Sequence, residues 1–208
     1  KKYDDIKTIK NYYISFATSW QSAYYVNAFD NCARKAYFVQ DFEPYFYPVG
    51  SRYIFAENTY KFAFEGVTAG SWLSHKLSKE YGMKCIDYTF SYDKNLYVKR
   101  EKKDDKKRIF FYARPNTDRR GFELGLVALN ELYKKDNSIE IILAGSDTSE
   151  YEIPFKYINF GVLDIDKLSE VYSNCSLALI LSFTNLSLLP LELLASGCPV
   201  VINSGENN

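Results

Sequence analysis

Hydrophobic and polar positions alternate in regular blocks along the second half of the chain. Short continuous apolar runs are typical of buried strands, and longer stretches with apolar residues three and four apart are typical of helices. The predicted strands are residues 108–112, 139–144, 157–160, 177–181 and 200–203. The predicted helices are residues 121–135, 166–173 and 188–196. Strands that alternate with helices in this way predict a parallel sheet with helices on both faces.

The first half carries the same alternation with shorter and less regular blocks. Its predicted strands are residues 13–17, 36–40, 66–70 and 84–88. Its predicted helices are residues 20–29 and 71–79, and residues 52–64 are predicted to form a turn and a helix. A run of charges of both signs follows at residues 101–107, as is typical of a solvated linker. We therefore expect an α/β chain with one domain at residues 1–100, a linker at 101–107 and a second domain at 108–208.

Residues 181–203 combine a strand, a loop, a short helix, a turn and another strand. Glu192 is the one charge in this unit, and its helical neighbours are Leu188, Leu189, Ala195 and Ser196. A glutamate that faces solvent more often has charged neighbours, so we expect Glu192 to project into a crevice and to have a polar partner there. The amides near Leu188 and Leu189 begin the helix, where they favour an anion. A phosphate joined to a hydroxylated sugar suits both features.

Several polar residues are expected at the edge of the second sheet where its strands end. Arg114, Gly145 and Thr184 each follow a predicted strand, and Arg119 and Arg120 precede the next helix. Ligands of open parallel sheets bind beyond the carboxyl ends of the strands. Guanidinium groups pair bidentately with phosphate oxygens, which predicts a diphosphate site here. The alternative for Arg119 and Arg120 is that they are solvated charges at the start of a helix.

The first half offers a separate group of candidates. Asp41 and Glu43 follow a predicted strand and are two residues apart, and paired carboxylates also occur in glycoside hydrolases. The alternative is that Asp41 caps a turn and Pro44 holds Glu43. Gln40 is open to hydrogen bonding with a sugar. Trp20 is either a sugar-stacking platform or, as we expect more strongly, a core residue.

Composition and cysteine spacing exclude several classes of function. Lys plus Arg and Asp plus Glu each number 26, so the net charge of zero argues against a nucleic acid partner. Cys32, Cys85, Cys175 and Cys198 are far apart and match neither a zinc site nor a disulfide framework. The single histidine, His75, has polar neighbours that predict a surface position. Apolar runs are too short for a membrane span, so we expect a soluble, cytoplasmic protein without a metal site.

Three motifs resemble one enzyme family. They are residues 111–115 (FYARP), residues 119–122 (RRGF) and residues 190–201, which begin PLEL and end PVV. Together they resemble the donor half of the family-4 retaining glycosyltransferases, which have the GT-B architecture. Residues 37–48 (YFVQDFEPYFYP) are similar to a more specific group, the rhamnosyltransferases of bacterial rhamnan and surface-polysaccharide synthesis.

The resemblance implies two Rossmann-like domains that face a cleft, with a nucleotide-sugar donor on the second domain. It implies that Arg114 and the Arg119–Arg120 pair neutralise the donor diphosphate, and that Glu192 holds the nucleotide ribose. The family has a further glutamate eight residues earlier, where this chain has Thr184. A deoxysugar donor such as dTDP-rhamnose is one substrate that would fit this difference. The acceptor is expected to be a glycan, either free or lipid-linked.

Two alternative functions remain compatible with this resemblance. The family continues beyond both ends of the sequence, so we expect both domains to be incomplete. One alternative function is therefore a catalytically silent module that binds or assembles carbohydrate. A weaker alternative is a glycoside hydrolase that uses Asp41 and Glu43. No cofactor is implied beyond the donor itself, and peripheral attachment to the inner membrane face is compatible with a cytoplasmic location.

Overall fold

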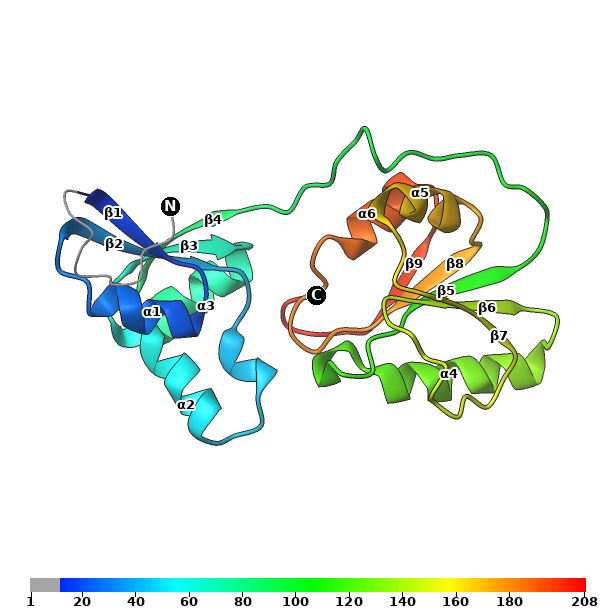
Figure 1. Cartoon of the computed structure of the whole chain (residues 1–208), viewed down its shortest axis with the longest axis horizontal. Helices are drawn as coiled ribbons and strands as arrows, with labels where there is room; N and C mark the ends of the chain where they lie inside the picture. Colours follow the sequence, from blue (N-terminus) through cyan, green and yellow to red (C-terminus); the bar gives the residue numbers. More distant parts are fainter. Residues whose placement is uncertain (1–11) are drawn as a thin grey trace. The chain divides into compact units, whose positions relative to one another are not determined.

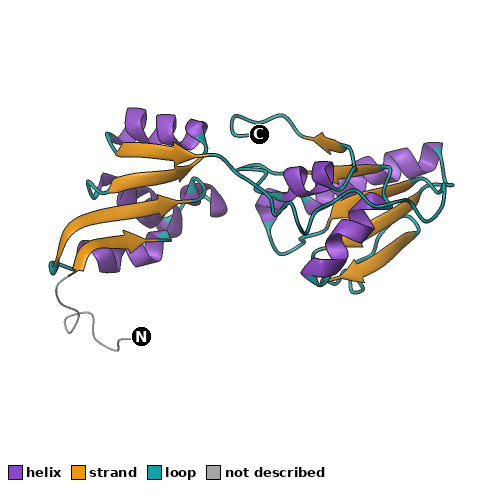
Figure 2. Ribbon diagram, turned by 90° about the horizontal axis from the view of Figure 1, so that it is seen from above, coloured by secondary structure: helices purple, strands orange, loops and turns teal. Residues whose placement is uncertain are grey.

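A computed structural model describes residues 12–208 of the chain (Figure 1). It contains two compact units, which divide between Phe90 and Ser91. Each unit has its own parallel sheet, its own helices and its own apolar core (Figure 2).

The first unit is a four-stranded parallel sheet in the order β1-β2-β3-β4. Its strands are β1 (Tyr12–Ala17), β2 (Cys32–Val39), β3 (Glu65–Ala69) and β4 (Lys84–Tyr88). Its helices are α1 (Trp20–Asn27), α2 (Ser51–Asn58) and α3 (Ser71–Tyr81), with short 3-10 turns η2 (Glu43–Phe46) and η3 (Thr59–Lys61). Each strand pairs with the next strand in the chain, so every connection moves one position across the sheet in the same direction. Because such connections are right-handed, the helices lie on one face of the sheet (Figure 1).

Local sequence signals fix the ends of the helices in this unit. Ser19 is the N-cap of α1 and forms a reciprocal capping box with Ser22. Gly82 ends α3 in the left-handed conformation with a φ of 68°. The helices and the sheet enclose a core with many aromatic rings, in which Tyr37, Tyr60 and Phe42 are almost fully buried. Many of the aromatic residues of the first half therefore serve packing.

The second unit is a five-stranded parallel sheet in the order β7-β6-β5-β8-β9. Its strands are β5 (Arg108–Tyr112), β6 (Glu140–Ala144), β7 (Tyr157–Gly161), β8 (Leu177–Ile180) and β9 (Val200–Ile202). Its helices are α4 (Phe122–Lys135), α5 (Ile165–Ser173) and α6 (Leu189–Ala195), and the 3-10 turn η4 (Asp118–Arg120) precedes α4.

Helices cover both faces of this second sheet (Figure 1). The neighbouring residues Phe110 and Phe111 of β5 point to opposite faces, as adjacent residues of a strand must. Phe110 packs in the core beneath α5 and α6, and Phe111 packs in the core beneath α4. Strand β6, the next strand in the chain, pairs with one edge of β5, whereas the later strand β8 pairs with its other edge. This reversal between β5 and β8 is the place where open α/β sheets bind ligands.

Residues 91–100 lie with the second unit, although the sequence pattern assigned them to the first domain. Tyr97 is 5% exposed and belongs to the core beneath α5 and α6. Two buried serines of α5 also hold this segment, because Ser169 and Ser173 form hydrogen bonds with the backbone of Val98 and Arg100. The segment has no apolar periodicity, so its packing was not visible in the sequence.

The observed strands and helices follow the predicted ones closely, with two differences. Strand β2 begins at Cys32, four residues earlier than the apolar run suggests. Its early part includes the charged residues Arg34 and Lys35, and Arg34 pairs with Glu65 of β3 on the sheet surface. Residues 52–64, predicted as a turn and a helix, form the helix α2 first and then the 3-10 turn η3.

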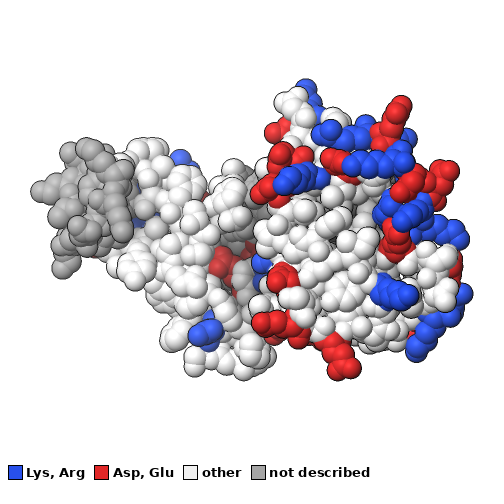
Figure 3. Space-filling view, turned by 45° about the vertical axis from the view of Figure 1, so that its right-hand side comes forward, with Lys and Arg blue, Asp and Glu red and all other residues white. Residues whose placement is uncertain are grey.

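Charged side chains of both signs gather over the second unit on the face shown in Figure 3. Within residues 103–108, several charges pair with charges of the sheet and helices of this unit. Lys106 and Arg108 both bind Glu140, and Lys107 binds Asp136. The charge run predicted as a solvated linker is therefore tied to the second unit by ion pairs. None of the helices between residues 12 and 208 combines the length and apolarity that a membrane-spanning helix requires.

Candidate functional site

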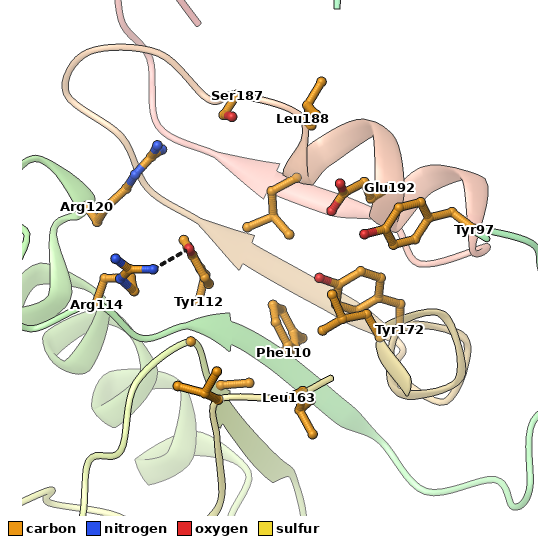
Figure 4. Close-up of a pocket in the computed structure, with 15 residues that line it drawn as sticks. Tyr97, Phe110, Tyr112, Arg114, Arg120, Leu163, Tyr172, Ser187, Leu188 and Glu192 are labelled. Atoms are coloured by element: carbon orange, nitrogen blue, oxygen red, sulfur yellow. Dashed lines mark hydrogen bonds between the residues drawn. The ribbon is translucent and has the colours of Figure 1, made fainter. Parts of the chain in front are cut away.

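A cavity of about 360 Å³ opens at the carboxyl edge of the second sheet, on the face covered by α5 and α6 (Figure 4). The ends of β5 and β6, the segments before α5 and α6, and α6 itself contribute its walls. The lining residues are Tyr97, Phe110, Tyr112, Arg114, Arg120, Ala144, Gly145, Val162, Leu163, Leu168, Tyr172, Ser187, Leu188, Leu189 and Glu192. The position is the one expected from the reversal of strand order between β5 and β8.

Two arginines supply the positive charge of the cavity. Arg114 follows β5, and its Nη1 donates a hydrogen bond to the Tyr112 hydroxyl over 3.0 Å. Arg120 ends the turn η4, and its Nη1 donates to the backbone carbonyl of Asn185 over 2.9 Å. Figure 4 shows the two guanidinium groups near one another at the same end of the cavity. Two such groups are well suited to bind the oxygens of a diphosphate.

Glu192 supplies the negative charge of the cavity. It projects from the first turn of α6 and is partly buried, beside Tyr97 and Tyr172 in Figure 4. Burial raises the pKa of Glu192, and a hydrogen bond from Tyr97 lowers that pKa in part. A carboxylate in this position can accept hydrogen bonds from the hydroxyl groups of a sugar.

Gly145 lets the loop after β6 approach the cavity wall closely. Its φ of 120° is strained for any residue with a side chain. A Cβ atom at this position would lie 2.6 Å from the ring of Tyr112 and 3.0 Å from the carbonyl oxygen of Ala113. The glycine predicted from the sequence therefore has a steric reason to be there.

Arg119 and Thr184 lie outside the set of residues that line the cavity. The carbonyl of Arg119 accepts a hydrogen bond from the amide of Phe183 over 2.9 Å, which joins η4 to the loop after β8. Thr184 is 5% exposed, and its buried hydroxyl has no hydrogen-bond partner among the residues that the structure describes. Leu188 and Leu189 do line the cavity, beside Glu192. Arg119 and Thr184 are therefore the two predicted donor-site residues that do not line the cavity.

The carboxylates of the first unit are engaged with the protein itself. Glu43 is 7% exposed; its Oε1 accepts a hydrogen bond from the Tyr37 hydroxyl over 2.6 Å, and its Oε2 accepts one from the Trp20 amide over 2.8 Å. Asp41 is 6% exposed, and its Oδ1 accepts a hydrogen bond from the Phe42 amide. Neither carboxylate is presented to solvent as a hydrolase pair would be, and Glu43 begins η2 instead of following the strand directly.

The other candidates of the first unit are divided between packing and exposure. Trp20 stacks on Phe55 with ring centroids 6.4 Å apart, and its indole nitrogen donates to the Tyr47 hydroxyl over 3.0 Å. Gln40 and His75 are exposed. Trp20 is therefore held by its neighbours, which supports the packing interpretation.

Sequence reasoning did not single out the three tyrosines of the cavity, Tyr97, Tyr112 and Tyr172, whose hydroxyls are polar groups of its wall. Tyr112 is the last residue of β5 and precedes Arg114 by two positions, which is the signal that it shares the same edge. Ser187 lies in the loop before α6 with a φ of 60°, a conformation uncommon for serine. Tyr97 comes from outside the strand and helix alternation, so no pattern indicated it. Among the described residues, no three of His, Cys, Asp or Glu are grouped closely enough to hold a metal ion.

Comparisons with known proteins agree with this organisation. Residues 6–69 match the family described as the N-terminal domain of WsaF, and residues 107–208 match the family described as the C-terminal domain of WsaF. Both parts of the chain therefore resemble WsaF. The WsaF-like C-terminal part contains nearly the whole cavity, and Tyr97 is its one lining residue outside the matched range.

One curated relative extends the similarity over the whole chain. The O-antigen biosynthesis protein RfbC of Myxococcus xanthus is 33% identical over 210 residues, which include 99% of this chain. The chain spans 16% of the length of that relative.

Solved structures of glycosyltransferases share the fold. Sucrose-phosphate synthase from Thermosynechococcus elongatus superimposes with a TM-score of 0.73 at 12% identity, over 91% of this chain and 55% of that one. A TarM mutant of S. aureus, in complex with Fondaparinux, alpha-GlcNAc-glycerol and UDP, matches with a TM-score of 0.66 at 12% identity, over 84% of this chain and 37% of that one. The pneumococcal O-GlcNAc transferase GtfA, in complex with UDP and GlcNAc, matches with a TM-score of 0.58 at 14% identity, over 84% and 38%. The predicted fold class is confirmed: the chain is α/β and GT-B-like, with two Rossmann-like domains.

Proposed function

We propose that this chain is the donor-binding part of a glycosyltransferase that transfers a sugar from a nucleoside diphosphate to a glycan during surface-polysaccharide synthesis. One observation carries the proposal: a single cavity of the WsaF-like C-terminal part contains two arginines at one end and a glutamate farther along its wall. A diphosphate joined to a ribose needs positive charge and a carboxylate in that order along its length. The similarity to an O-antigen biosynthesis protein supports the same class of product.

In this proposal each polar group of the cavity has one task. Arg114 and Arg120 bind the diphosphate and stabilise the negative charge that develops on it as the sugar leaves. Glu192 binds the ribose hydroxyls, and Gly145 gives the backbone room to approach the donor. Because the arginines neutralise the leaving group, we propose a reaction that needs no metal ion.

The finer assignments are also proposals. The motifs at residues 111–122 and 190–201 support a family-4 enzyme that retains the configuration of the transferred sugar. The absence of a second carboxylate at Thr184 supports a deoxysugar donor, of which dTDP-rhamnose is the example to test first. The acceptor would be a glycan, free or lipid-linked, and the reaction would take place in the cytoplasm, where we expect this protein.

Calorimetric titration of the full chain with UDP, dTDP and GDP tests the proposal. We expect at least one of these nucleotides to bind at one site per chain and to bind more weakly to the Glu192→Gln variant. Arg52→Ala, which changes an exposed arginine of the first unit, is the matched control and should bind as the wild type does. No binding of any of the three nucleotides would contradict the proposal.

A transfer assay separates an enzyme from a catalytically silent module. The buried, uncharged Thr184 outside the cavity is the observation that favours the silent alternative. Incubation with the matching nucleotide-sugar and an oligosaccharide acceptor should release nucleoside diphosphate and extend the acceptor. Activity that survives chelation by EDTA supports the metal-free mechanism, whereas activity that is lost and then restored by manganese contradicts it. Glycan binding without nucleotide binding would support the silent module.

A further inference from the structure

The segment that leaves the first unit is built into the wall of the second. Ser169 of α5 donates a hydrogen bond to the Val98 carbonyl over 2.8 Å and accepts one from the Val98 amide over 3.2 Å. Ser173, one turn later, accepts a hydrogen bond from the Arg100 amide over 3.0 Å and donates one to the Ser196 carbonyl over 2.9 Å. These serines are at most 3% exposed. Buried hydrogen bonds of this kind fix the path of the segment between α5 and α6.

Along this path, the side chain of Tyr97 forms part of the cavity wall. A turn fixes its backbone, because the Tyr97 amide donates to the Asp93 carbonyl over 3.0 Å. Its ring stacks on Tyr172 of α5 with centroids 6.2 Å apart and an interplanar angle of 13°. Figure 4 shows the Tyr97 hydroxyl beside the carboxylate of Glu192, and both side chains line the cavity. Stacking on Tyr172 therefore orients the ring of Tyr97, with its hydroxyl toward the carboxylate.

We propose that Tyr97 is a positioning residue for Glu192, whose carboxylate it holds in the orientation that accepts the ribose hydroxyls of a nucleotide. The inference rests on the proposed function, and it adds a residue that lies outside the strand and helix alternation. From its place beside the carboxylate, the Tyr97 hydroxyl would donate to one carboxylate oxygen and leave the other acceptor positions to a ligand of the cavity. Without that bond the glutamate side chain has several rotamers, and only some of them face the ribose.

The charges around Glu192 agree with this role. Tyr97 and Tyr172 lie beside Glu192 in Figure 4. The other charged or titratable residues that line the same cavity are Tyr112, Arg114 and Arg120. Burial raises the pKa of Tyr97 to about 12, and the neighbouring Glu192 carboxylate adds to that rise. The hydroxyl therefore keeps its proton and donates throughout the physiological range. Burial raises the pKa of Glu192, and the Tyr97 bond opposes that rise, so loss of the hydroxyl should raise this pKa further.

A double-mutant cycle tests the coupling. Tyr97→Phe removes the hydroxyl and keeps the ring that stacks on Tyr172, and Glu192→Gln removes the charge. UDP and dTDP affinity is measured by calorimetry for the wild type, both single variants and the double variant. We expect Tyr97→Phe to weaken binding about tenfold in the wild type, and to have almost no effect when Glu192 is already glutamine. Equal effects of Tyr97→Phe in both backgrounds would overturn the inference.

A second measurement requires no nucleotide. The pKa of Glu192 is measured by NMR titration of its carboxyl carbon in the full chain, for the wild type and Tyr97→Phe. We expect a higher pKa in the variant, and therefore nucleotide binding that is lost at a higher pH as the solution is acidified. An unchanged pKa would overturn the inference. Failure of UDP, dTDP and GDP to bind, with the expected pKa change still present, would instead reject the proposed function and leave only the Tyr97–Glu192 contact.

Discussion

The guanidinium of Arg114 lies against the ring of Tyr112, the residue that ends the same strand. Its Nη1 donates to the tyrosine hydroxyl over 3.0 Å, and its Cζ lies 5.6 Å from the ring centroid. Among the described residues, no carboxylate forms an ion pair with Arg114. A neutral partner therefore orients this cation without cancelling its charge, which leaves the charge available to an anion.

Replacement of Arg114 should weaken nucleotide binding strongly. Loss of one charge-assisted contact costs about 1.5–3 kcal/mol, so Arg114→Ala is expected to weaken nucleoside diphosphate binding about ten- to a hundredfold. Tyr112→Phe, which keeps the ring and loses the hydroxyl, should have a smaller effect. Calorimetry checks both variants, and an unchanged affinity of Arg114→Ala would remove this residue from the site.

The neighbouring arginines should behave differently from each other. Arg120 lines the cavity, whereas Arg119 does not. We expect Arg120→Ala to weaken nucleotide binding about tenfold or more and Arg119→Ala to leave it nearly unchanged once folding is verified by circular dichroism. The reverse order of effects would show that the turn η4 presents the other side chain to the donor.

Glu43 should make the first unit more stable as the pH falls. Burial raises its pKa above the ordinary value, and hydrogen bonds from Tyr37 and Trp20 lower that pKa only in part. The folded state therefore binds this proton at a higher pH than the unfolded chain does, so acidification toward the unfolded pKa favours folding.

This prediction can be measured because both tryptophans, Trp20 and Trp72, belong to the first unit. Their fluorescence reports urea unfolding of that unit in the wild type and in Glu43→Gln. The stability difference between the two should move in favour of the wild type as the pH falls from about 7 to about 5. A difference that does not depend on pH would mean that Glu43 titrates normally.

Gly125 of α4 is expected to resist substitution. A Cβ atom at this position would overlap the ring of Phe111, which is fully buried beneath the helix. Alanine raises helix propensity by about 1 kcal/mol, but overpacking costs about 1–3 kcal/mol, so we expect Gly125→Ala to be destabilising or at best neutral. Thermal unfolding measured by circular dichroism checks this. Combination with Phe111→Leu should restore part of any loss, and a clearly stabilised Gly125→Ala would show that the ring can move.

Much of the second unit could be predicted from the apolar pattern. Strand β5 has the predicted bounds, and α4 begins one residue after the predicted start. The strand is almost entirely buried and the helix buries one face, so the apolar pattern of each is clear. The early start of β2 could not be predicted, because Arg34 is satisfied by Glu65, 31 residues away.

The candidate site could be predicted only in part. Glu192 was indicated by its apolar helical neighbours, and Arg114 by its position after a strand. Arg119 and Arg120 could not be separated, because they are adjacent and their directions depend on η4. Glu43 and Asp41 were ambiguous, because their hydrogen-bond partners are set by packing within the first unit.

The sequence by itself determined the α/β alternation, the edge of the second sheet where the cavity lies, and the charged residues placed after its strands. These depend on local periodicity and on chain direction, which are properties of neighbouring residues. Only the tertiary structure decided which side chains meet in the cavity. Tyr97 contacts Glu192 across 95 positions of sequence because buried serines of α5 hold its segment in place. A contact between residues far apart in sequence forms only when the whole unit folds, and the pattern of neighbouring residues does not predict it.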